Sequence, residues 1–187
     1  MTATNQLFIG LMLLLPLVFM ACDDERVDPQ TEELITNLTL TLAPAGAGAP
    51  IVLSFTDVDG EGGAEGVFST TPLMANTTYA GSVTLLNTAD GATADITRDI
   101  EADEESYQLF YQAMMGLNLT AGYEDADANN NPIGLLTTIT TGEASTGTLK
   151  VTLRSQLTKN AAGVSDGDIS NAGGDTDFEV VFEVEIQ

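Results

Sequence analysis

The sequence has no histidine and no tryptophan, a single cysteine, and only five lysine and arginine residues. Without histidine, Ser-His-Asp and Cys-His catalysis are excluded, together with the commonest protein ligand of zinc, copper and haem. A single cysteine cannot form a disulfide within the chain, so the folded domain depends on its hydrophobic core. These absences exclude most catalytic functions, and we expect a protein that is not an enzyme.

Acidic residues dominate the charge of the chain. The sequence has 28 Asp and Glu residues and a formal net charge of −23. A surface of this kind repels nucleic acid and anionic lipid headgroups, so we expect no nucleic-acid partner. It attracts divalent cations and basic patches on other proteins. Apolar residues make up 43% of the chain, which is too much for a disordered acidic protein.

The N-terminal segment has the features of an export signal. An apolar run over residues 7–20 is too short to span a bilayer comfortably and is followed closely by Cys22. The pattern resembles a bacterial lipoprotein signal peptide, in which residues 1–21 are removed and Cys22 carries lipid. Residues 22–32 would then form an acidic flexible tether. The alternative is an ordinary secretory signal, because Phe19 replaces the usual leucine of the lipobox and no basic residue precedes the apolar run.

From residue 33 to the end, apolar residues recur at every second position, which is the periodicity of β-strands. The last run is the clearest: three glutamates, Glu179, Glu183 and Glu185, lie opposite the apolar residues Phe178, Val180, Phe182, Val184 and Ile186. We predict strands over residues 34–42, 51–56, 78–86, 92–100, 106–114, 117–123, 134–140, 146–154 and 178–186. Residues 106–114 also fit a helix, but the alternation of Tyr107, Leu109 and Tyr111 favours a strand. No long segment has a helical period.

The predicted fold of residues 33–187 is all-β. About eight or nine strands joined by turns rich in Gly, Asp, Asn and Pro are typical of an antiparallel β-sandwich, and we expect an immunoglobulin-like one. An up-and-down barrel or a jelly roll is the alternative architecture. In either case the chain forms one domain after the tether.

Two predicted loops concentrate oxygen ligands. Ca²⁺ takes six to eight oxygens, and short acidic loops supply them from alternate positions. The candidate calcium ligands are Asp57, Asp59 and Glu61 in one loop and Asp125, Asp127, Asn129 and Asn131 in the other. One loop could form the site, or both if they meet at one end of the sandwich. The alternative is that these residues only stabilise turns by bonding to their own backbone.

Three segments carry a family resemblance: residues 76–87, 140–154 and 173–187. They resemble a group of small lipoproteins from Bacteroidota that often carry the name "type 1 periplasmic binding fold superfamily protein". That name denotes a long two-lobed α/β fold, whereas strands and helices do not alternate in this chain, so we keep the β-sandwich prediction. The acidic residues 23–25 after Cys22 also resemble the signal that displays Bacteroidota lipoproteins on the cell surface.

Together these features predict a non-catalytic lipoprotein of the cell envelope, anchored to the outer membrane through Cys22 and stabilised by calcium if the acidic loops bind it. Its function would be that of a binding or accessory module, with an outer-membrane protein as partner. Capture of a small ligand or a metal for an outer-membrane uptake system is the alternative. A hydrolase that uses two carboxylates as acid and base is a third hypothesis.

Overall fold

The computed structural model describes residues 34–59, 64–89 and 91–187, all within the unit Thr31–Gln187. The predicted signal peptide, Cys22, the tether and Glu61 lie outside the described residues. None of the helices in these three ranges is long and apolar enough to cross a membrane.

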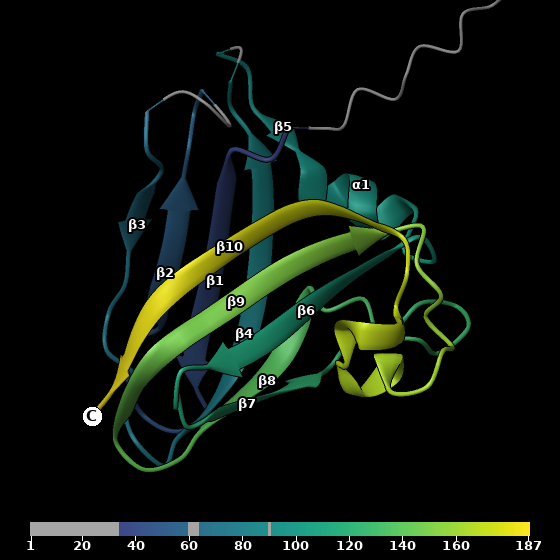
Figure 1. The fold of residues 1–187 in the computed structure, drawn as a ribbon. Helices are drawn as coiled ribbons and strands as arrows, with labels where there is room; N and C mark the ends of the chain where they lie inside the picture. Colours follow the sequence, from purple (N-terminus) through teal and green to yellow (C-terminus); the bar gives the residue numbers. More distant parts are fainter. Residues whose placement is uncertain (1–33, 60–63, 90) are drawn as a thin grey trace, which may run out of the picture. The chain divides into compact units, whose positions relative to one another are not determined.

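The described residues form two antiparallel sheets that face each other, as Figure 1 shows. The large sheet contains β1 (Asn37–Pro44), β2 (Ile51–Thr56), β3 (Val67–Ser69), β4 (Thr78–Asn87), β5 (Ala94–Asp95), β7 (Leu119–Tyr123) and β8 (Leu136–Thr141). The small sheet contains β6 (Tyr107–Met114), β9 (Ser145–Ser155) and β10 (Asp175–Ile186). A helix α1 (Ile96–Ala102) and two 3₁₀ turns, η1 (Val164–Asp166) and η2 (Ile169–Asn171), complete the fold. The predicted all-β sandwich is confirmed.

The strand order matches the immunoglobulin topology. The large sheet has the order β3-β2-β1-β4-β8-β7, with β5 paired to β4, and the small sheet has the order β10-β9-β6. Within the large sheet, β1, β4, β8 and β7 lie side by side like strands A, B, E and D of a constant-type domain. In the small sheet, β6, β9 and β10 correspond to strands C, F and G. The β2–β3 hairpin is an insertion between A and B that widens the large sheet.

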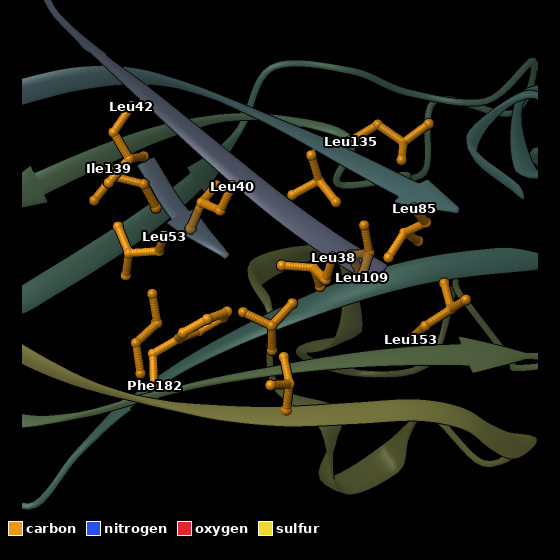
Figure 2. Packing of buried hydrophobic residues seen from close by; sticks show 14 of the residues in the cluster. Leu38, Leu40, Leu42, Leu53, Leu85, Leu109, Leu135, Ile139, Leu153 and Phe182 are labelled. Carbon is orange, nitrogen blue, oxygen red and sulfur yellow. The ribbon is translucent and has the colours of Figure 1, made fainter. Parts of the chain in front are cut away.

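The core lies between the two sheets and follows the predicted alternation. Leu38, Leu40 and Leu42 of β1 are fully buried, as are Leu149 and Val151 of β9. Figure 2 shows these leucines of β1 and Phe182 from the opposite sheet in one cluster of buried side chains. Each fully buried side chain of this kind contributes about 1.5–3 kcal/mol of transfer free energy.

Two local predictions were wrong. Residues 92–100 were expected to form one strand, but only Ala94–Asp95 is strand and Ile96–Ala102 is helical. The two buried isoleucines, Ile96 and Ile100, are four residues apart, and this spacing places them on one face of a helix as well as of a strand. The strand β3 was not predicted, because it has three residues and all of them are exposed.

The segment between the predicted strands 146–154 and 178–186 covers the outer face of the small sheet. Val164 of η1 and Ala172 pack on Phe110 of β6, and all three are fully buried in a second, smaller cluster. Gln108 Nε2 on the same face donates a hydrogen bond to the Val164 carbonyl at 3.0 Å. The small sheet is therefore buried on both faces around Phe110.

Candidate functional sites

The acidic loop between β7 and β8 is built around a lysine from another loop. Lys159 Nζ lies 3.2 Å from Asp127 Oδ2, and it also donates to the carbonyls of Glu104 at 2.6 Å and Pro132 at 3.0 Å. The exposed fractions of the Lys159 and Asp127 side chains are 4% and 1%. An ammonium group has three hydrogens, so each one has an acceptor here. The predicted calcium ligand Asp127 thus already binds a cation that the chain supplies.

The other oxygen of Asp127 organises the loop backbone. Asp127 Oδ1 accepts hydrogen bonds from the backbone amides of Asn129 and Asn131, each at 2.9 Å. Burial raises the pKa of the Asp127 carboxyl, but the bonds from the Asn131 amide, Lys159 and the Asn129 amide outweigh it, so this pKa lies below the ordinary value. Asp127 is therefore a carboxylate at neutral pH, paired with Lys159.

Asp125 fixes the return of this loop into β8. Its Oδ1 accepts from the Gly134 amide at 2.7 Å, and its Oδ2 accepts from the Leu136 amide at 2.8 Å. Gly134 has φ +92°, and a Cβ at this position would lie 2.8 Å from the Leu109 carbonyl oxygen, so the turn requires glycine. Asp125 and Asp127 thus lie in one loop, but their carboxylates serve separate parts of its backbone, and Asn129 is exposed.

The other acidic loop follows β2 and is more open. Asp59 is exposed, and its Oδ2 accepts from the Ala64 amide at 2.9 Å. This hydrogen bond lowers the pKa of Asp59, and Asp57 contributes a smaller effect in the same direction. The third predicted ligand, Glu61, lies outside the described residues, so the calcium prediction for this loop stays a prediction.

The two acidic loops begin on strands that are not neighbours. The strands β2 and β7 run in the same direction, so both loops leave the same end of the large sheet. Three strands, β1, β4 and β8, lie between them, which separates the loops by about 19 Å at the usual strand spacing. The described carboxylates of the two loops are therefore not brought together at the ends of these strands, and a shared site that includes Glu61 stays a prediction. Across residues 34–59, 64–89 and 91–187, no three acidic side chains are close enough to hold a metal.

The outer face of the large sheet has few charged side chains. Its outward positions are mostly hydroxyl residues: Ser69 on β3, Ser54 and Thr56 on β2, Thr39 and Thr41 on β1, Thr78, Ser82 and Thr84 on β4, Thr138 and Thr140 on β8, and Thr120 on β7. The register aligns them in rows across the sheet, for example Ser69, Ser54, Thr39 and Thr84. Two carboxylates reach it: Asp95 on the short strand β5, and Glu124, which follows β7 and accepts a hydrogen bond from Thr138 Oγ1. We call this surface the hydroxyl face.

The small sheet carries a groove where its outer face is not covered by η1 and η2. The groove has a volume of 620 Å³ and crosses the end of β10 and the start of β9. Its lining includes Thr70, Pro72, Thr148, Glu183, Glu185 and Met115. Met115 is 82% exposed, so the groove offers an apolar side chain next to two carboxylates.

No known protein family, curated protein or solved structure matches this chain. Function must therefore be inferred from the buried ion pair, the hydroxyl face and the open side of the small sheet. Lys159 was not among the predicted site residues. The sequence has five basic residues and 28 acidic ones, so a lysine that becomes buried is expected to pair with a carboxylate of the same chain.

Proposed function

We propose that this chain is a non-catalytic binding or accessory lipoprotein of the cell envelope. Lipid on Cys22 would anchor it to the outer membrane, and the hydroxyl face would contact a protein partner there, such as an outer-membrane protein. The observation that carries this proposal is the absence of charged residues from the outward strand positions of β1, β2, β3, β4, β7 and β8, in a chain of net charge −23.

The physical argument concerns the cost of removing water. A charged side chain loses several kcal/mol of hydration when a contact buries it without a partner, whereas hydroxyl groups can both donate and accept hydrogen bonds. Six strands span about 24 Å, and the ten residues of β4 extend about 34 Å, so the face offers at most about 800 Å². That area equals one partner's share of a standard protein interface.

Lipid attachment is tested by mass spectrometry of the protein extracted from membranes. We expect Cys22 to be the N-terminal residue and to carry acyl chains. The variant Cys22→Ser should leave the membrane fraction, because the chain has no other cysteine that could carry lipid. An unmodified residue 22 in the mature protein would disprove the anchor.

Contact through the hydroxyl face is tested by site-specific photo-cross-linking in cells. A cross-linking amino acid at Ser82, in the centre of the face, should capture a reproducible partner. The same amino acid at Ser165, an exposed position on the covering loop, is the matched control. Equal capture from both positions, or none from Ser82, would contradict the proposed contact surface.

Capture of a small ligand or a metal remains a second candidate, and the groove with Glu183 and Glu185 favours it. Calorimetry with Ca²⁺, other divalent ions and haem tests this function directly. Binding that is lost in Glu185→Gln would place the ligand in the groove, and calcium binding lost in Asp59→Asn would place it in the loop after β2. The absence of a heat of binding with all of these ligands would disprove the capture function.

A further inference from the structure

β10 is a long strand with one open edge. It forms the outermost strand of the small sheet and pairs only with β9 along its length, as Figure 1 shows in yellow. At its C-terminal end, the segment after β3 runs parallel to it: the Leu73 amide donates to the Glu185 carbonyl at 2.8 Å, and the Gln187 amide donates to the Leu73 carbonyl at 2.9 Å. Before Leu73, residues 70–72 line the groove beside Glu183 and Glu185, but no hydrogen bond from them to β10 is present.

The remaining edge groups follow from the alternation of an antiparallel strand. Because the backbone of Glu185 points to the outer edge, the N–H and C=O groups of Glu183, Val181 and Glu179 point the same way. Within the described part of the chain, no backbone or side-chain group bonds to these edge groups. A stretch of about 14 Å, from residue 179 to residue 183, therefore has backbone groups without hydrogen-bond partners among the described residues.

Side chains on both faces of this edge indicate what such a strand contains. On the outer face, Glu179, Val181 and Glu183 are exposed in succession, and Glu183 has no ion pair with any described residue. On the inner face, the Phe68 ring is 49% exposed and packs on Phe182 with the ring centres 5.8 Å apart. An added strand would place alternate side chains against the glutamates and over Phe68.

We infer that the β10 edge binds an extended protein segment in which lysine or arginine alternates with apolar residues. The backbone of that segment would continue the small sheet, as in other cases of β-strand addition. Its basic side chains would face Glu183 and Glu179, of which Glu179 also binds Lys150 at 3.1 Å, and its apolar side chains would cover Phe68. This inference is independent of the lipid anchor and of the hydroxyl face.

The same glutamates argue against a second copy of this chain as the occupant. Charged side chains on an edge strand oppose pairing with an identical strand, since like charges would be placed side by side. The net charge of −23 adds repulsion between copies over a longer range. The edge is thus selective for a strand of opposite charge.

The test uses the protein extracted from membranes in detergent and a synthetic peptide, Val-Lys-Val-Thr-Val-Lys-Val. We expect binding that weakens with salt, together with slower hydrogen–deuterium exchange at the Val181 and Glu183 amides. A peptide of the same charge with proline at the central position cannot complete the ladder and should not protect these amides. Equal binding and protection with both peptides would overturn strand addition.

Protein variants distinguish binding at the β10 edge from attraction of the peptide by the net charge of the protein. Glu183→Lys should weaken peptide binding about fivefold or more, whereas Glu143→Lys, in the turn before β9, changes the net charge equally and should leave affinity almost unchanged. Val181→Pro removes one outward N–H, and an edge strand tolerates proline at such a position. Unchanged binding in both Glu183→Lys and Val181→Pro, or a dimer in sedimentation that is lost in these variants, would refute the inference.

Discussion

The two acidic loops look alike in sequence but use their carboxylates differently. In the loop after β7, Asp127 pairs with the buried Lys159, and Asp125 bonds two backbone amides. In the loop after β2, Asp59 is exposed and accepts one backbone hydrogen bond among the described residues. The difference shows that an Asp-x-Asp pattern identifies a loop but does not tell whether a cation from outside or a side chain from the same chain balances its charge.

The largest effect is expected when the internal cation, the Lys159 ammonium group, is removed. Lys159→Met leaves the Asp127 carboxylate buried without its partner, and we expect a loss of about 3–5 kcal/mol in urea unfolding. Lys150→Met is the matched control, because Lys150 forms its ion pair with Glu179 at the surface and should cost at most about 1 kcal/mol. Equal losses in the two variants would mean that burial of the Lys159 pair has no special effect.

A second change tests the loop without touching the lysine. Asp125→Ala leaves the Gly134 and Leu136 amides without their acceptor, and we expect a loss of about 1–3 kcal/mol. Hydrogen exchange at these two amides should accelerate in the variant. Unchanged exchange there would show that other groups hold the turn into β8.

The next largest effect is expected on lowering the pH, through the ion pair of Asp127 and Lys159. The pKa of Asp127 is lower in the folded protein than in the unfolded chain, so the unfolded chain takes up the proton more readily. The stability from this group is present at neutral pH and is lost as the pH falls below about 4. Urea unfolding from pH 7 to pH 2 should therefore show a shallower decline for Asp127→Asn than for the native protein.

The smallest effect is expected in the open loop. Asp59→Ala removes one hydrogen bond to an exposed amide, and the melting temperature should not change measurably in the absence of calcium. Adding Ca²⁺ then tests the predicted ligands: a rise in melting temperature that disappears in this variant would assign calcium to this loop. A large loss of stability without calcium would show that the loops are more alike than their contacts indicate.

Much of the fold was predictable because alternation is a local signal. The runs that became β2, β6 and β10 place the predicted alternate residues on the core face, whereas Phe110 of β6 lies on the covered outer face. The ion pair was not predictable, because Lys159 and Asp127 are 32 residues apart and neither has a local feature that points to the other. The hydroxyl face was predictable only in part, since Thr39 and Thr41 show it within one strand but its extent depends on the register of six strands.

The distribution of charge between the hydroxyl face and the rest of the surface makes ionic strength a diagnostic for any newly found partner. Attraction between exposed charges is screened within about 10 Å at 0.1 M salt, whereas contacts between neutral groups are almost indifferent to it. A complex that persists at high salt would therefore form through the hydroxyl face. A complex that dissociates would form through the β10 edge. A titration with sodium chloride could assign the binding surface before any mutation is made.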